Sequence, residues 1–271
     1  MNKILVLGTA LIDNIIQSNT PINEGICNKA SSLLMAGGSM RNVAYNLGIL
    51  GLKVDFLSVW GNDDYSLLIK KELKAIDIDT KGPQIDLPTP VFTHINTAAT
   101  SYSISSFTPD FYLDYNYPFA YQDYSLLITD SENEKLLENI LTINPDIKFI
   151  ITDHLPNIKF DNIIGIALNR HEFYNQVNNH NYHKVCKDYP NAWLTVTLDV
   201  DGAFCGDKAD SFTITNKNIV ANGCSLGCGD AFVSAMIYKM QKQASLKEAT
   251  DFSLSLSQKV YNSPKNVLVK D

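Results

Sequence analysis

Short apolar runs alternate along most of the chain with longer segments whose apolar residues recur every three or four positions. The runs are typical of buried strands and lie at residues 4–7, 53–59, 148–152 and 193–198. The longer segments predict helices at residues 39–51, 65–75, 131–141, 232–240 and 246–260. We expect Ser39 to cap the first of these helices. Strands that alternate with helices predict right-handed βαβ units and therefore an α/β fold.

The middle of the chain interrupts this alternation. Residues 91–107 (VFTHINTAATSYSISSF) are rich in Thr, Ser, β-branched and aromatic residues, which predicts a β-hairpin or small sheet. Residues 13–35 are polar and are expected to be irregular. We see no internal repeat and no long linker in the sequence. We therefore expect one α/β domain of residues 1–271, with lid segments near 13–36 and 88–118 over a site.

Composition and charge exclude several classes of function. Hydrophobic residues make up 45% of the 271 positions, and the formal net charge is −7. A surface that binds nucleic acid needs clustered Lys and Arg, so we expect no nucleic-acid partner. The apolar stretches are too short to cross a membrane, and no signal peptide or membrane association is expected. Five scattered cysteines indicate reduced thiols and a cytoplasmic protein.

The strongest chemical signal is Gly227-Cys228-Gly229-Asp230, directly before an apolar helix. Glycine lets the backbone approach a ligand, and the first N–H groups of a helix bind anions because they have no partner within the helix. Asp230 beside such an anion site suits a general base that accepts a proton from an attacking hydroxyl during phosphoryl transfer. By itself the string fits an ordinary helix start at least as well, since Asp favours the first turn.

Four stretches, in order, resemble the signatures of the ribokinase (PfkB) carbohydrate kinase family. Residues 222–238 (NGCSLGCGDAFVSAMIY) are similar to its C-terminal Thr-Gly-Ala-Gly-Asp-Ala-Phe signature. Residues 37–51 (GGSMRNVAYNLGILG) resemble its N-terminal Gly-Gly signature. Residues 169–172 (NRHE) resemble its Asn-x-x-Glu motif, and residues 197–203 (TLDVDGA) its Thr-Leu-Gly-x-x-Gly nucleotide segment. The resemblance spans nearly the whole chain.

The resemblance implies a fold and a set of roles. The fold is a mostly parallel, twisted sheet sandwiched by helices, with a small β lid. Asp230 is implied as the catalytic base, and the backbone of Gly227, Cys228 and Gly229 as the anion hole. The residues implied in binding substrate are Asp13, Gly37, Gly38, Arg41 and Asn42. Those implied around ATP are Asn169, Thr197, Asp199 and Gly202, with Glu172 organising Mg²⁺, which keeps most of its waters and binds mainly through phosphates.

The sequence departs from the family in three places. Cys224 and Leu226 stand where the family often has Asp and Thr before the anion hole. That Asp often helps to place a monovalent cation, so we do not expect potassium activation. Asp199 replaces the usual glycine of the nucleotide segment, and its charge is expected to disfavour ATP phosphates. The stretch from Asp153 to Asn169 is shorter than usual, as if a βα unit were missing.

The expected activity is ATP-dependent phosphorylation of a hydroxymethyl group on a sugar or nucleoside. Arg41-Asn42-Val43-Ala44 resembles the pseudouridine kinase branch, and the planar fork of Arg41 suits the carbonyl oxygens of a base. We therefore favour a pseudouridine-like acceptor, with ribose and fructose as alternatives. A weakly active or non-catalytic kinase-fold protein that binds a small molecule is the rival from another class. The lid is expected to pair two copies as a homodimer.

Overall fold

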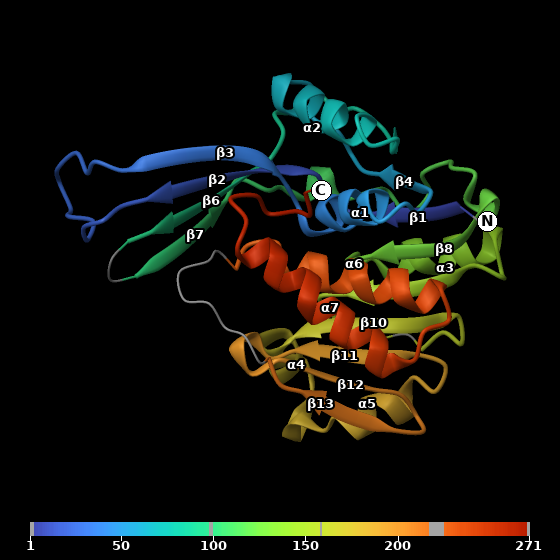
Figure 1. Cartoon of the computed structure of the whole chain (residues 1–271). Coiled ribbons are helices and arrows are strands. Elements are labelled where there is room, and N and C mark those ends of the chain that lie inside the picture. The colour runs from blue at the N-terminus through green and yellow to red at the C-terminus, as the bar shows by residue number, and fades with distance from the viewer. Residues whose placement is uncertain (1–2, 98–99, 158, 217–224, 270–271) are drawn as a thin grey trace.

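A nine-stranded sheet forms the centre of the protein (Figure 1). The structure is a computed structural model that describes residues 3–97, 100–157, 159–216 and 225–269. From edge to edge, the strands are β13 (Ser211–Ile214), β12 (Ala203–Gly206), β11 (Trp193–Thr197), β10 (Ile163–Asn169), β9 (Lys148–Thr152), β8 (Tyr124–Thr129), β1 (Lys3–Leu7), β4 (Val54–Leu57) and β5 (Asp79–Lys81). Neighbours are parallel from β11 to β5, and β12 and β13 add antiparallel strands. The expected mostly parallel sheet is confirmed.

Helices cover both faces of this sheet. One face carries α1 (Ser39–Ile49), α2 (Asp64–Lys74), α6 (Cys228–Gln241) and α7 (Leu246–Tyr261), and the other carries α3 (Glu134–Ile143), α4 (Arg170–Gln176) and α5 (Tyr182–Asp188). Short 3₁₀ turns lie at Pro109–Phe111, Tyr121–Asp123, Asn178–His180 and Asp199–Asp201. Successive strand residues point to opposite faces, so Val6 packs in the core beneath α1 and α6 while Leu7 packs in the core beneath α3. This double burial explains why the central strands are continuous apolar runs.

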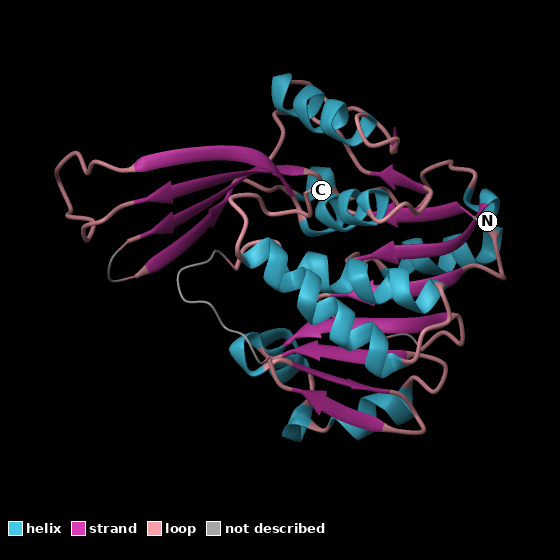
Figure 2. Ribbon diagram, in the orientation of Figure 1, coloured by secondary structure: helices cyan, strands magenta, loops and turns pink. Residues whose placement is uncertain are grey.

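A second sheet of four strands, which we call the lid, extends beyond the main one (Figure 2). Its order is β3 (Ser31–Gly37), β2 (Leu11–Gln17), β6 (Val91–Asn96) and β7 (Ser101–Ser105). β6 and β7 are the predicted hairpin. The expectation that residues 13–35 are irregular is wrong, because β2 and the start of β3 lie there. Only the start of β2 and the end of β3 are well buried, so neither strand shows an alternation of apolar and polar residues in its sequence.

Other elements differ locally from the sequence prediction. The strands β8, β10, β12 and β13 were not predicted. β10 follows β9 after residues 153–162, a connection without a helix among its described residues, which accords with the short middle of the chain. Ser39 begins α1 but does not cap it: Gly38 is the N-cap, and no side chain makes a capping bond there.

The carboxyl ends of the parallel strands meet at one edge of the main sheet, and the base of the lid adjoins this edge. Open α/β sheets bind ligands at this edge. Gly8 follows β1, Asp130 follows β8, Asp153 follows β9 and Arg170 follows β10. In the part of the chain that the structure describes, no helix has both the length and the apolar character to cross a membrane.

Candidate active site

Three cavities lie at the carboxyl edge of the sheet. The lid cavity, about 360 Å³, lies between the lid strands and the ends of β1, β4 and β8. The central cavity, about 150 Å³, lies at the start of α6 and contains Asp230. The outer cavity, about 490 Å³, lies between α7 and the end of β11. Because the central and outer cavities share Asn169, Thr197, Gly229 and Phe232, a ligand can extend from one into the other.

The start of α6 has the geometry of an anion site. Gly227 is its N-cap with φ of 78°, a left-handed conformation that favours glycine. A side chain at Gly227 would place its Cβ 1.9 Å from the backbone oxygen of Asn266, whereas a Cβ at Gly229 would meet no atom within 4 Å. The backbone at Cys228 and Gly229 therefore borders open space at the positive end of the helix.

Asp230 lies in the first turn of α6 and is held by α1. The Nδ2 atom of Asn42 donates a hydrogen bond to its Oδ2 at 2.8 Å. Burial raises the pKa of Asp230 to about 7, and the negative charge of Asp153 adds to this shift. The hydrogen bond from Asn42 acts in the opposite direction, since it stabilises the ionised form. Asp230 is therefore a carboxyl group whose pKa suits proton transfer near neutral pH.

Arg41 does not extend into any of these cavities. Its side chain is 1% exposed and forms an ion pair with Glu72 on α2. Its Nη1 donates to the backbone oxygen of Ala36 at 3.3 Å and to Oδ1 of Asn42 at 3.2 Å. Because Arg41 engages Oδ1, the Nδ2 of Asn42 is directed to Asp230. Arg41 therefore contacts Ala36, Asn42 and Glu72 and does not reach the space in which direct contact with a base was expected.

Asp13 lies on β2 and is almost completely buried, with 4% of its surface exposed. Asn266 donates to its Oδ2 at 2.8 Å, and Nε2 of His94 lies 3.8 Å from its Oδ1. Burial raises the pKa of Asp13, whereas the contacts with Asn266 and His94 lower it. His94 and Asn266 could not be identified as site residues from the sequence, because neither lies in a recognisable motif.

Both glycines of the Gly37-Gly38 pair are required by close packing. A Cβ at Gly37 would lie 2.3 Å from Oδ2 of Asp13. Gly38 has φ of 97°, and its Cβ would lie 2.3 Å from the backbone oxygen of Thr9. The pair thus allows α1 to begin directly against Asp13 and the end of β1.

Asn169 and Glu172 form a capping box at the start of α4. Glu172 accepts a hydrogen bond from the backbone N–H of Asn169 at 2.7 Å, and the side chain of Asn169 caps the helix in return. Burial raises the pKa of Glu172 to about 7 and that of Asp153 to about 6. Both carboxyl groups line the central cavity with Asp230.

These carboxyl groups fit a magnesium ion that binds mainly through phosphates. Oxygen ligands are those that Mg²⁺ prefers, and it commonly keeps several waters. Within the described residues, no three acidic, His or Cys side chains are grouped closely enough to hold a metal by themselves.

The outer cavity is lined by the residues that the nucleotide motif indicated. Thr197, Asp199 and Gly202 lie there, and Gly202 has φ of 107° with no room for a Cβ beside Ile214. Asp199 adopts φ of 54° without being glycine. Nε of Arg170 lies 3.9 Å from a carboxylate oxygen of Asp199, while Nη2 of the same residue pairs with Asp201 at 2.5 Å. One guanidinium therefore faces two carboxylates and neutralises the charge of Asp199 only in part. Cys224 lies outside the described residues.

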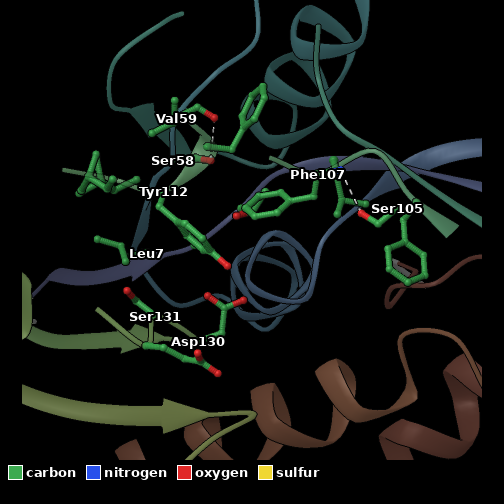
Figure 3. A pocket seen from close by; sticks show the side chains of 16 residues that line it. Leu7, Ser58, Val59, Ser105, Phe107, Tyr112, Asp130 and Ser131 are labelled. Carbon is green, nitrogen blue, oxygen red and sulfur yellow. Dashed lines mark hydrogen bonds between the residues drawn. The ribbon is translucent and has the colours of Figure 1, made fainter. Parts of the chain in front are cut away.

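The lid cavity has aromatic walls and an acidic floor (Figure 3). Phe92, Phe107, Phe111 and Tyr112 line it from the lid and the following turn, together with Asp130, Ser131 and Glu132 after β8. The hydroxyl of Tyr112 and the carboxylate of Asp130 point into the same space. Burial and the charges of Asp153 and Asp230 raise the pKa of Asp130 to about 8, which links this cavity electrostatically to the central one.

Comparisons with known proteins agree with this geometry. The family model described as pfkB family carbohydrate kinase matches residues 1–265. Guanosine-inosine kinase of Exiguobacterium acetylicum is 37% identical over 75 residues, which is 28% of this chain and only 25% of that protein. Ribokinase from Cryptococcus neoformans var. grubii serotype A, solved with ADP, has a TM-score of 0.79 at 15% identity and covers 100% of this chain and 98% of its own. The nucleoside kinase of Methanocaldococcus jannaschii also has a TM-score of 0.79, at 16% identity, covering 98% of this chain and 93% of its own.

Proposed function

This chain belongs to the pfkB family of carbohydrate kinases, and we propose that it transfers the γ-phosphoryl group of ATP to the hydroxymethyl group of a nucleoside. The family supports a phosphotransferase that acts on a sugar hydroxyl with ATP as co-substrate. The nucleoside as acceptor rests on one observation, the aromatic lid cavity next to the central cavity.

The lid cavity suits a planar base better than a second sugar hydroxyl. A base can stack on the ring faces of Phe107 and Tyr112 or contact their edges. Each aromatic contact of this kind stabilises a complex by about 1 kcal/mol. Glu132 supplies acceptors for the N–H groups on the edge of a base, and Asp130, whose pKa is raised to about 8, also offers an O–H donor while it is protonated. A free sugar bound at Asp13 and Asn42 would leave this space of about 360 Å³ without a ligand.

Asp230 provides the chemistry at the centre. Its carboxylate accepts the proton of the hydroxymethyl group as the new oxygen–phosphorus bond forms, and the bond from phosphorus to the leaving oxygen of ADP breaks. The backbone at Gly227, Cys228 and Gly229, at the positive end of α6, would stabilise the charge on the transferring phosphoryl group. In this structure the N–H of Cys228 donates to the backbone oxygen of Ser225 at 3.1 Å. Thr197, Asp199, Gly202 and Asn169 line the space for ATP.

Magnesium supplies charge neutralisation at the phosphates when it is bound. Glu172 and Asn169, with Asp153 beside them, are the residues that would hold its waters. Burial raises the pKa of Glu172 to about 7. A nearby cation would lower this pKa and so favour the ionised carboxylate.

Steady-state kinetics with Mg-ATP test the acceptor. We expect kcat/KM to be higher for nucleosides (pseudouridine, uridine, guanosine and inosine) than for ribose or fructose, with pseudouridine favoured by the resemblance of residues 41–44. Replacing Phe107 with Ala should lower kcat/KM for nucleosides about tenfold while leaving ribose unaffected, because stacking on the base is lost. The matched control is Tyr115→Ala, an exposed aromatic residue outside the cavity.

A clear preference for a free sugar, unchanged in Phe107→Ala, would refute the nucleoside proposal and leave the kinase assignment intact. Binding of nucleoside and ATP without any turnover would instead favour the non-catalytic alternative.

The lid also supports a homodimer, which we propose forms through its outer face. Register places Asp13 and Phe92 on the face toward the cavity, so Leu34 and Ile104 lie on the opposite face. Leu34, Tyr102 and Ile104 are exposed there, on the edge strands β3 and β7. Exposed apolar side chains on an edge strand favour pairing with another chain.

A further inference from the structure

The segment after α7 returns across the molecule to the base of the lid (Figure 1). Val267 and Leu268 are buried in this segment, and the backbone N–H of Leu268 donates to Oδ1 of Asn46 on α1 at 2.8 Å. Asn266 is also buried, with 4% of its surface exposed. It lies just beyond residues 1–265, which match the family. The segment therefore packs firmly, and one of its buried side chains is polar.

The side-chain amide of Asn266 donates two hydrogen bonds to groups on the side of the site where the sugar or nucleoside is expected to bind. One N–H donates to Oδ2 of Asp13 at 2.8 Å, and the other to the backbone oxygen of Ala36 at 3.1 Å. A hydrogen bond to a carboxylate stabilises its ionised form, and this contact lowers the pKa of Asp13 against the effect of burial. Asn266 thus fixes one oxygen of Asp13 and helps to keep the group charged.

The backbone of Asn266 meets the other side of the site. Its carbonyl oxygen lies so close to Gly227 that a Cβ there would be 1.9 Å away. Gly227 is the N-cap of α6, and Asp230 follows three residues later. One residue therefore contacts both the buried carboxylate on the lid strand β2 and the turn of the anion site.

We propose that Asn266 is a positioning residue that holds Asp13 at a set distance from the anion turn at Gly227. This inference rests on the proposed function, in which Asp13 binds the acceptor and Asp230 receives its proton. A fixed Asp13 aligns the hydroxymethyl group with Asp230 and with the phosphoryl group, and misplacement of reacting groups by even a short distance slows such reactions strongly.

Packing alone does not account for Asn266. Val267 and Leu268 already anchor the segment through apolar burial. A buried amide loses its contacts with water and must recover them from specific partners, so an apolar residue would serve a purely structural segment equally well. The partners here are Asp13 and Ala36, at the junction of the lid and α1.

Kinetic constants for three variants of the full chain test the role. Asn266→Ala should raise KM for the acceptor about tenfold, because a hydrogen bond to a charged group is lost, and should change KM for ATP by less than about twofold. Asn266→Asp should raise acceptor KM further, since a second carboxylate would face Asp13. Val267→Ala is the matched control: it should lower Tm as Asn266→Ala does but leave both KM values unchanged.

A double-mutant cycle separates positioning from general damage. In the Asp13→Asn background, Asn266→Ala should have almost no further effect on acceptor KM, because the contact acts through Asp13. Equal changes in both KM values, or the same effect in either background, would overturn the role of Asn266 while leaving the kinase proposal intact. A wild-type chain without turnover on any acceptor would refute the kinase proposal, and the role of Asn266 with it.

Discussion

Asp230 places a half-buried carboxyl group beside an anion site, a pairing that costs stability and that a role in catalysis would explain. Replacing it with Asn keeps the shape and the contact with Asn42 but removes the proton acceptor. We expect Asp230→Asn to bind ATP and acceptor normally and to lose turnover by a factor on the order of 10²–10⁴.

The control for this variant is Asp251→Asn, an exposed aspartate on the neighbouring helix α7. Its kcat should equal that of the wild type. Near-normal turnover in Asp230→Asn would exclude Asp230 as the base.

The pKa of Asp230 also predicts a pH dependence. Burial and the charge of Asp153 raise this pKa to about 7, and only the ionised form accepts a proton. Hence kcat/KM should fall as pH drops below about 7, by roughly tenfold per pH unit. Asp153→Asn removes one of the charges that raise the pKa, so the fall should move to lower pH. A profile that stays flat from about pH 5.5 to about pH 8 would contradict a base with this pKa.

At the scale of elements, the lid strands β6 and β7 form one wall of the acceptor space. Phe92 on β6 and Ser105 on β7 line the lid cavity; β6 is half-buried along its whole length, and β7 is exposed along its whole length. Closure over a bound acceptor would exclude water and order these strands. We expect peptides within residues 91–96 and 101–105 to exchange amide hydrogen more slowly with saturating acceptor.

The central strand β9 is the reference in this experiment, since it is buried with or without ligand. Unchanged exchange in β6 and β7 at saturating acceptor would count against the lid as a moving element. Slower exchange throughout the chain would indicate general stabilisation by ligand instead.

At the scale of the whole molecule, the lid extends well away from the main sheet, so its outer face is free to meet a second copy (Figure 1). Light scattering coupled to size-exclusion chromatography should give twice the mass of one chain. Ile104→Lys should shift this to the mass of a monomer, because a charge would be buried in the apolar contact.

Ile143→Lys is the control for the dimer, since Ile143 is an exposed apolar residue at the end of α3, away from the lid. It should leave the mass unchanged. A monomer for the wild type would remove the proposed dimer without affecting the kinase assignment.

Features that depend only on neighbouring residues could be predicted from the amino-acid sequence. The periodicity of short segments was sufficient for β1, β4, β9 and β11 and for α2, α6 and α7. The string from Gly227 to Asp230 was recognisable because the N–H groups of a helix start and the carboxylate that follows them lie within one turn. For the same reason, Asn169 and Glu172 could be assigned together. The strands β2 and β3 were missed because their outer halves are exposed, which leaves no burial pattern to detect.

Contacts between distant segments became visible only once the chain was folded. Asn42 and Asp230 are 188 positions apart, and Asp13 and Asn266 are 253 apart. The burial of Arg41 against Glu72, and the joining of lid aromatics to Asp130, likewise depend on elements that pack together after long loops close. Local propensity and periodicity report which face of a segment is apolar, but they carry no information on which other segment will cover it. The role of Asp230 could therefore be predicted from the sequence, whereas its hydrogen-bond partners and the shape of the lid cavity depend on the packing of distant segments.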